Sequence, residues 1–163
     1  RRSGAPVLLL GETDDDPRVL PILIGPVEAR SIVVGASQIE PPRPATHDLI
    51  IDVLECLGAE LDQVEVTELR DSTFIAELAV HDDSGAHRIS CRPSDAFALA
   101  ARLGVAILVR ADVLDQAGVH LRLGPDQEPD DDEIDRIVSE FQEFLSTADP
   151  ADFGRPPSTD EPG

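Results

Sequence analysis

The hydrophobic pattern of this 163-residue chain changes its period several times, and this alternation restricts the fold more than any other feature. Alternating or continuous apolar runs, typical of strands, lie at 7–10, 18–24, 64–66, 74–80 and 87–91. Apolar residues spaced three and four apart, typical of helices, lie at 26–37, 46–57 and 93–103. Short turns join the last three strands, which predicts an antiparallel meander. We therefore predict an α+β domain over residues 1–123, with a mixed or antiparallel sheet packed against about three helices.

Three local features predict how this sheet and its core are built. The run Val105 to Val109 is continuously apolar, which predicts a strand buried on both faces. Pro21 lies inside an earlier strand, and because proline has no N–H for the ladder, we expect a sheet edge or a bulge there. The chain has no Trp and no Tyr, so the core must be aliphatic.

Residues 124–163 differ in composition and form an acidic C-terminal extension. Four acidic residues at 130–133 precede a stripe of apolar side chains at helical spacing, which predicts an amphipathic helix over about residues 131–147. The stripe consists of Ile134, Ile137, Val138, Phe141 and Leu145. From Asp149 onward, proline, serine and acidic residues predict a disordered tail.

The charge is unusual, with 33 acidic residues against 13 arginines, no lysine and a formal net charge of -20. Duplex binding gains most of its affinity from neutralised phosphates, so this charge disfavours avid nucleic-acid binding. A nucleic-acid role must therefore rest on a local arginine patch or on bound metal ions. A further hypothesis, that the acidic tail imitates nucleic acid and docks on a basic partner, rests on the charge alone.

The sequence also predicts a cellular compartment. No apolar run approaches the ~20 residues that a membrane helix needs. The two cysteines, Cys56 and Cys91, do not form a Cys-x-x-Cys pair, and we expect both to be buried free thiols in a reducing cytoplasm.

The common catalytic signatures are absent: there is no Walker loop, dinucleotide-type glycine fingerprint, His-Glu-x-x-His or nucleophile elbow. The four histidines are scattered, and we expect His81 and His87, beside a hairpin turn, to be solvated. What remains is a shared pattern at three helix starts, where an acidic residue lies near an arginine or a small hydroxyl. The residues concerned are Glu28 in the first helix, Arg43, Thr46, His47 and Asp48 at the second, and Arg92, Ser94 and Asp95 at the third.

Two interpretations of these helix starts compete. In the structural interpretation, Thr46 and Ser94 are N-caps and the acids complement the helix dipoles. In the functional interpretation, the arginines and helix N-termini bind phosphate, while His and Asp hold a divalent ion that activates water. Arg70 and Asp71 admit a similar pair of interpretations, as an ion pair across a turn or as a substrate contact.

Four stretches together resemble the bifunctional nuclease domain family. They are LPILIGPVEA at 20–29, PPRPATHDL at 41–49, RDSTFIAEL at 70–78 and CRPSDAFALA at 91–100. The resemblance implies a compact α+β domain over residues 6–123 that self-associates. It also implies a metal-dependent nuclease that acts on both DNA and RNA. It also implies a strand before residue 6, so the domain here would lack its first strand. The family's hairpin turn commonly carries Gly where Ser72 stands, so we expect a different turn conformation.

Our leading hypothesis is a metal-assisted nuclease. In it, Asp48, Asp95 and His47 are catalytic, Asp48, Asp95 and Glu28 bind Mg²⁺ or Mn²⁺, and Arg43, Arg92, Ser94 and Thr46 bind phosphate. The alternative is a non-catalytic module, a homo-oligomer such as a dimer, that binds a small anionic ligand or a protein partner. An unpaired strand edge at 7–10 would also favour self-association.

Overall fold

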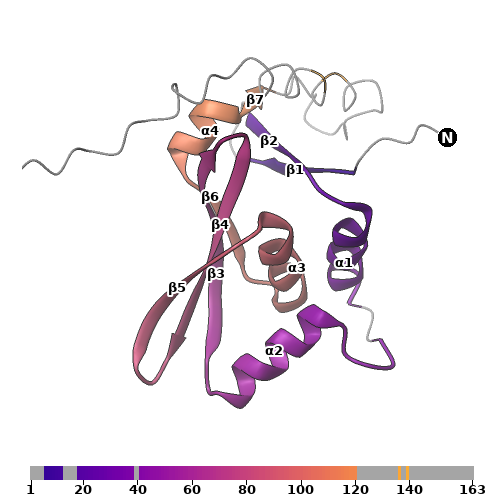
Figure 1. Ribbon diagram of the computed structural model, residues 1–163, viewed down its shortest axis with the longest axis vertical. Coiled ribbons are helices and arrows are strands. Elements are labelled where there is room, and N and C mark those ends of the chain that lie inside the picture. Colours follow the sequence, from indigo (N-terminus) through magenta and orange to yellow (C-terminus); the bar gives the residue numbers. More distant parts are fainter. Residues whose placement is uncertain (1–5, 13–17, 39–40, 121–135, 137–138, 140–163) are drawn as a thin grey trace, which may run out of the picture.

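The computed structural model describes residues 6–12, 18–38, 41–120, 136 and 139 (Figure 1). Its strands form two sheets, one of three strands in the order β1-β2-β7 and one of four in the order β5-β4-β3-β6. The strands are β1 (Val7–Gly11), β2 (Arg18–Leu23), β3 (Glu60–Arg70), β4 (Thr73–Asp82), β5 (Gly85–Cys91), β6 (Ala106–Val109) and β7 (Val119–His120). The helices are α1 (Pro26–Ala36), α2 (Thr46–Cys56), α3 (Pro93–Leu103) and α4 (Ala111–Ala117).

The α+β class is confirmed, and the predicted meander is the antiparallel run β3-β4-β5. The larger sheet is mixed because β6 pairs parallel to β3. The strands are divided over two sheets, however, where the sequence pattern suggested one. A hydrophobic period identifies a strand but not its neighbours, which is why the pattern could not reveal this division.

Two predictions about single strands had different outcomes. The run that contains β6 was expected to be buried on both faces, but β6 is an edge strand, and Ile107 and Leu108 are 39% and 41% exposed. Pro21 was expected at an edge or a bulge, and although β2 is the central strand of its sheet, Pro21 does lie at a local edge, because it is paired only with Leu9 of β1. β7 pairs only with Arg18 and Val19, so the short partner ends before it reaches the proline, whose missing N–H breaks no ladder there.

The hydrophobic core lies between the four-stranded sheet and α3, which packs on β3, β4, α1 and α2 (Figure 1). Phe97 and Leu99 of α3 are each 1% exposed, and Val64 and Val66 of β3 are fully buried. The core is mainly aliphatic, as predicted, with Phe74 and Phe97 as its aromatic members. Because α3 is enclosed on several sides, its first turn is held firmly against the starts of α1 and α2.

Three further predictions concern membrane helices, the two cysteines and the C-terminal extension. In that region no helix is long and apolar enough to cross a membrane. Both cysteines are free, but Cys56 is exposed rather than buried, and burial raises the pKa of the half-buried Cys91 to about 11. The predicted helix over 131–147 and the acidic tail lie outside the described residues, apart from Arg136 and Ser139.

Candidate functional site

The first turns of α1 and α3 meet at one arginine, Arg92. Its Nη1 donates to Glu28 Oε1 at 3.2 Å, while its Nε and Nη2 donate to the two carboxylate oxygens of Asp95 at 2.8 and 2.9 Å. The Arg92 side chain is 65% exposed, so its head reaches solvent between the two acids. A guanidinium has five N–H donors, and three are used here, which leaves two for a ligand.

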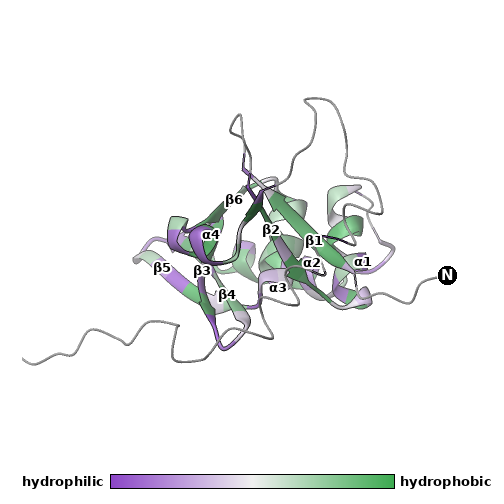
Figure 2. Ribbon diagram, turned by 90° about the horizontal axis from the view of Figure 1, so that it is seen from above, coloured by the Kyte–Doolittle hydropathy of each residue, from purple (hydrophilic) through white to green (hydrophobic). Residues whose placement is uncertain are grey.

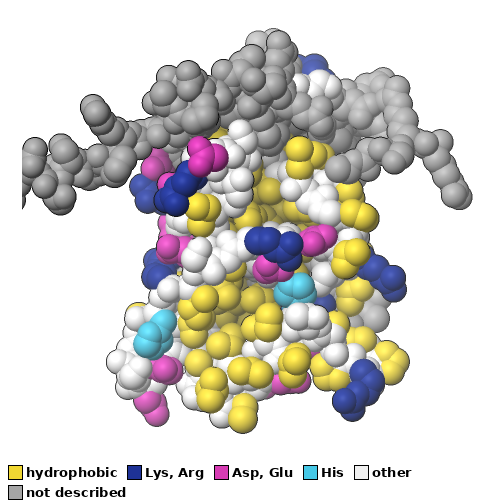
Figure 3. All heavy atoms as spheres, in the orientation of Figure 1, with side chains coloured by type: hydrophobic (Ala, Val, Ile, Leu, Met, Phe, Trp, Pro, Cys, Tyr) yellow, Lys and Arg dark blue, Asp and Glu magenta, His cyan; other side chains and the backbone are white. Residues whose placement is uncertain are grey.

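His47, in the first turn of α2, contacts both α1 and α3. Its Nε2 lies 3.4 Å from Asp95 Oδ1, and its Nδ1 lies 2.9 Å from Ser31 Oγ on α1. The imidazole is 14% exposed. The starts of α1, α2 and α3 therefore place Glu28, His47 and Asp95 around Arg92, and we call these four residues the three-helix cluster. Figure 3 shows basic, acidic and imidazole side chains grouped at the middle of one face.

Asp48 does not belong to the three-helix cluster, although it follows His47 directly. Its Oδ1 accepts from Arg102 Nε at 2.6 Å, and its Oδ2 accepts from the backbone N–H of Ala45 at 2.7 Å. Arg102 is 8% exposed and also donates from Nη1 to the carbonyls of Ser31 and Ala98 at 2.9 and 2.8 Å. Asp48 thus closes the start of α2 and fixes that helix to α1 and α3.

Sequence reasoning missed Ser31 and Arg102, although both hold the predicted residues in place. Arg102 lies seven residues after Asp95, two helical turns along the same face of α3, and this spacing could have indicated it. Ser31 carries no comparable signal, because a serine within an apolar helix has no preferred partner that the sequence reveals.

The predicted capping roles were wrong. α2 has Ala45 as its N-cap and α3 has Arg92, and neither helix start has a side-chain cap hydrogen bond from Thr46 or Ser94. Thr46 is exposed in the first turn of α2, while Ser94 is buried, with 7% exposed, in the first turn of α3. α2 begins at Thr46 itself and α3 begins at Pro93, one residue before Ser94, so both hydroxyls lie inside the helices rather than at the N-cap positions.

A pocket of about 270 Å³ lies beside Arg92 and Glu28. Besides these two residues it is lined by Ile22–Gly25, by the turn and strand residues Ser72–Phe74, and by Pro93 and Ser94. It combines an apolar wall with one cation, one carboxylate and hydroxyl groups, a composition common in small-molecule sites.

Asp95 of the three-helix cluster and the neighbouring Asp48 are held in their charged form. Hydrogen bonds from Arg92 lower the pKa of Asp95 despite its partial burial, and His47 adds a smaller effect in the same direction. The hydrogen bond from Arg102 likewise lowers the pKa of Asp48. Hydrogen bonds to Asp95 and to Glu28 raise the pKa of Arg92 above its usual value, so Arg92 and Asp95 remain an ion pair at neutral pH.

The predicted metal ligands Glu28, Asp48 and Asp95 do not come together. In the part of the chain that the structure describes, no group of three His, Cys, Asp or Glu side chains could hold an ion. Asp48 is bound to one arginine and Asp95 to another, so an ion would have to displace a guanidinium. As arranged, these donors do not fit the oxygen-rich site that Mg²⁺ requires, and a metal requirement stays a prediction.

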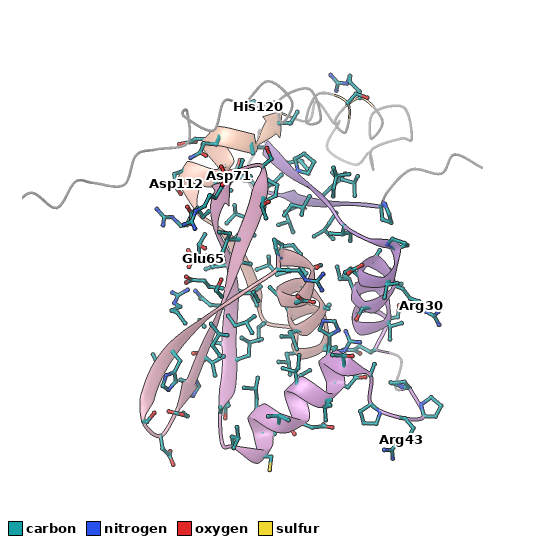
Figure 4. The ribbon with its side chains drawn as sticks, viewed as in Figure 1. Arg30, Arg43, Glu65, Asp71, Asp112 and His120 are labelled. Atoms are coloured by element: carbon teal, nitrogen blue, oxygen red, sulfur yellow. The ribbon has the colours of Figure 1, made fainter. Side chains whose placement is uncertain are left out.

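Arg43 and Arg30 differ from the other arginines near the cluster. Within the described residues, neither forms a hydrogen bond or an ion pair with another side chain, and both are exposed. Figure 4 shows Arg30 projecting from the outer side of α1 and Arg43 projecting from the proline-rich connection before α2. By contrast, Arg18, Arg70, Arg88, Arg92, Arg102 and Arg110 each contact an acid. A nucleic-acid role in a protein this acidic was expected to need local arginines that are not paired with acids. Among the described residues, two such arginines, Arg30 and Arg43, lie on α1 and just before α2.

The remaining singled-out residues have structural partners. Arg70 pairs with Glu68 rather than with Asp71, which occupies the turn. His81 and His87 are exposed, as predicted, and each also contacts an acid, Asp62 at 2.8 Å and Asp82 at 3.1 Å respectively.

Comparison with known proteins identifies the family of the chain. The family model described as the bifunctional nuclease domain matches residues 8–122. Two relatives from Mycobacterium tuberculosis, "Uncharacterized protein MT1877" of strain CDC 1551 and "Uncharacterized protein Rv1829" of strain H37Rv, are each 43% identical over 148 residues. These alignments cover 91% of this chain and 88% of each relative. The match spans all the described strands and helices almost completely, and the chain therefore belongs to the bifunctional nuclease domain family.

Proposed function

We propose that the protein is a nuclease that hydrolyses phosphodiester bonds of DNA or RNA at the three-helix cluster. The observation that carries this proposal is the convergence of an exposed arginine, an oriented imidazole and two carboxylates from three separate helix starts. Family membership supplies the reaction class. The arrangement supplies the two functions that such hydrolysis needs, a cation for the phosphate and a group that accepts a proton.

In this proposal, Arg92 binds the scissile phosphate through its two remaining N–H groups, beside the pocket of about 270 Å³. His47 acts as the general base. Its 3.4 Å contact with Asp95 is long for a hydrogen bond, so an incoming water can take the place of that contact. The imidazole then removes a proton from the water as the water oxygen bonds to phosphorus and the P–O bond to the departing nucleotide oxygen breaks. The departing oxygen takes a proton from solvent, and the negative charge of Asp95 stabilises the imidazolium that forms.

Glu28 and Asp95 have a second role, which is to fix the guanidinium of Arg92. Arg43 and Arg30 lie outside the cluster and bind phosphates further along the strand. With a net charge of -20, the protein holds its substrate only weakly and transiently. Single-stranded or unpaired substrate suits this arrangement, because it carries a lower charge density than a duplex.

The test is a cleavage assay on purified protein with single-stranded DNA, duplex DNA and RNA, each with Mg²⁺, with Mn²⁺ and with EDTA. We expect wild type to cleave and His47→Gln and Asp95→Asn to lose about 10²-fold or more of kcat/KM. Arg88→Gln is the control, because Arg88 pairs with Glu65 on the four-stranded sheet and lies outside the cluster. Circular dichroism verifies that each variant is folded.

The outcomes of this assay separate three cases. Cleavage that all variants share equally is contamination, and it contradicts the proposal. Cleavage that EDTA abolishes would confirm the predicted metal requirement. In that case a bound ion must displace the guanidinium of Arg92 from its carboxylates. An inert wild type in every condition contradicts nuclease activity.

One observation favours the alternative, a non-catalytic module that self-associates. The exposed side of α2 is apolar, with Leu49, Val53 and Leu57 exposed by 56%, 48% and 73%. Figure 3 shows hydrophobic side chains over much of the lower part of the same face. An apolar patch of this kind marks a contact surface in many soluble proteins. An inert protein that sediments as a dimer would favour this alternative, with Arg92 binding a small anion.

A further inference from the structure

The pocket beside Arg92 has an apolar side that phosphate binding leaves unused. Its lining comes from the end of β2, the start of α1, the β3–β4 turn and the first turn of α3. Figure 2 shows β2 coloured as hydrophobic along most of its length, and the end of this strand gives the pocket Ile22 and Leu23. The pocket therefore joins an apolar wall to the polar groups of two helix starts.

Ser94 is the polar residue of this pocket that the fold leaves without a partner. It is only 7% exposed, and its hydroxyl forms no hydrogen bond with any residue that the structure describes. In the same part of the chain, every side-chain polar atom that is cut off from solvent does have a partner. The Ser94 hydroxyl must therefore reach solvent, and the pocket is the opening that this residue lines. A hydroxyl held in this way can donate a hydrogen bond to a ligand and accept one from it.

Glu28 indicates which part of a nucleotide the pocket can take. Its Oε1 accepts from Arg92, whereas its Oε2 has no hydrogen-bond partner among the described residues and lies over Gly25, where a Cβ would collide with it. A carboxylate repels a second phosphate, but it accepts hydrogen bonds from the N–H groups on the edge of a nucleobase. The pocket therefore suits an uncharged base, while the phosphate stays on Arg92.

The size and the wall of the pocket agree with a single base. Its volume of about 270 Å³ lies just below the range of pockets that hold drug-sized ligands, so it has room for one base and not for a stack. Leu23 is 37% exposed at the wall and offers an apolar contact for the face of a base. A base that is paired and stacked in a duplex cannot enter such a pocket, so the base must be unpaired.

We propose that this pocket holds one unpaired nucleobase of the substrate strand, next to the phosphate on Arg92, and that the Ser94 hydroxyl forms a hydrogen bond with this base. The inference rests on the proposed function for the class of substrate. Leu23 contacts the face of the base, and Glu28 accepts from an N–H on its edge. Ser94 thereby selects the substrate and takes no part in the hydrolysis, and strands whose bases leave the stack easily are preferred.

The test is isothermal titration calorimetry of the full chain, in EDTA, with cytidine 5′-monophosphate and with ribose 5-phosphate, which has the same sugar and phosphate but no base. We expect the nucleotide to bind at least about tenfold more tightly. Ser94→Ala should weaken nucleotide binding by about threefold or more and leave ribose 5-phosphate binding unchanged. Ser90→Ala is the matched control, because Ser90 is an exposed serine on β5 that does not line the pocket, and it should change neither affinity.

Three results of this titration would overturn the proposal: no binding of either ligand, equal affinities for the two, or a nucleotide affinity that Ser94→Ala does not change. If Ser94→Ala does not fold, Leu23→Ala is compared with Leu103→Ala. Both leucines are partly exposed, and only Leu23 lines the pocket. Equal nucleotide affinities in that pair overturn the proposal as well.

A cleavage assay separates this inference from the proposed function. In a short single-stranded oligonucleotide with one base-free residue, we expect less cleavage at the phosphate next to that residue than at the same phosphate of the normal strand. Equal cleavage of the two strands overturns the base pocket and leaves the nuclease proposal intact. A protein that cleaves neither strand, but binds the nucleotide in a manner that depends on Ser94, supports the base pocket and contradicts the nuclease.

Discussion

The guanidinium of Arg102 joins three helices although only 8% of its side chain is exposed. It binds Asp48 of α2, the Ser31 carbonyl of α1 and the Ala98 carbonyl of its own helix. Gly35 of α1 makes this approach feasible, because a Cβ there would lie 2.9 Å from Arg102 Nη1 and 3.0 Å from its Cγ. Since Ser31 also contacts His47, the position of the imidazole depends on residues outside the three-helix cluster.

Replacing Asp48 by Asn should lower the free energy of unfolding at pH 7 by about 1–3 kcal/mol, because a charge-assisted hydrogen bond to the buried Arg102 is lost. The folded state lowers the pKa of Asp48 below its ordinary 3.8. The carboxylate therefore stabilises the fold fully above that pH, and this contribution is lost as the pH falls below it. Denaturation with urea from pH 7 to pH 2 measures the effect.

The difference between wild type and Asp48→Asn should shrink as the pH falls below about 4, because the unfolded wild type then takes up a proton before the folded one does. It should vanish once the folded carboxylate is protonated as well. Asp52→Asn is the control, because Asp52 lies one turn further along α2, is exposed and has no partner among the described residues. A difference that stays constant down to pH 2 would show that Arg102 does not set the effect.

At the scale of elements, the turn between β3 and β4 contains the backbone conformation least suited to its residues. Asp71 and Ser72 have φ angles of +47° and +60°, in the left-handed region, between the paired residues Arg70 and Thr73. Such two-residue turns match the twist of a hairpin and favour Asn or Asp followed by Gly. Serine adopts the left-handed conformation here, and the expected difference from the family's turn stays a prediction.

Replacing Ser72 by Gly should raise the free energy of unfolding by about 1 kcal/mol, because glycine adopts this φ without a steric cost. Thermal unfolding of the two proteins measures the change. Thr73→Gly, one residue later in β4, is the comparison and should lower stability, since glycine weakens a strand. Equal or lower stability of Ser72→Gly would mean that the turn is not strained.

At the scale of the whole molecule, the distribution of charge decides where an anionic strand can approach. The chain carries 13 arginines against 33 acids, and most described arginines are already paired with acids. Arg30 and Arg43 are the exceptions within the described residues, and both lie beside the three-helix cluster's α1 and α2 (Figure 4).

If these two arginines bind phosphates, Arg30→Gln and Arg43→Gln should each lower the slope of log affinity against log salt by about 1. Fluorescence anisotropy of a labelled single-stranded oligonucleotide in EDTA, at a series of low salt concentrations, measures this slope. Arg110→Gln should leave the slope nearly unchanged, because Arg110 already pairs with Asp112. Equal slopes for all variants and wild type would place the strand elsewhere.

Part of the site was predictable from the sequence. Glu28, His47, Arg92 and Asp95 were identified from the chemistry that helix starts share, and the structure brings these four together. Asp48 was assigned to the same group but contacts Arg102 instead. The sequence could not separate the two, because neighbouring residues in a helix differ by 100° in direction and only the packing of α2 decides which of them faces the cluster.

The sequence by itself determined the α+β class, the meander β3-β4-β5 and the existence of α1, α2 and α3. These follow from hydrophobic periods and from glycines and prolines at element ends, which act within a few residues. Only the tertiary structure decided that the strands form two sheets, that β6 lies at an edge and that Arg102 bridges three helices. Strand neighbours and buried ion pairs depend on contacts between residues far apart in the chain, and no local pattern records which of the available partners meet.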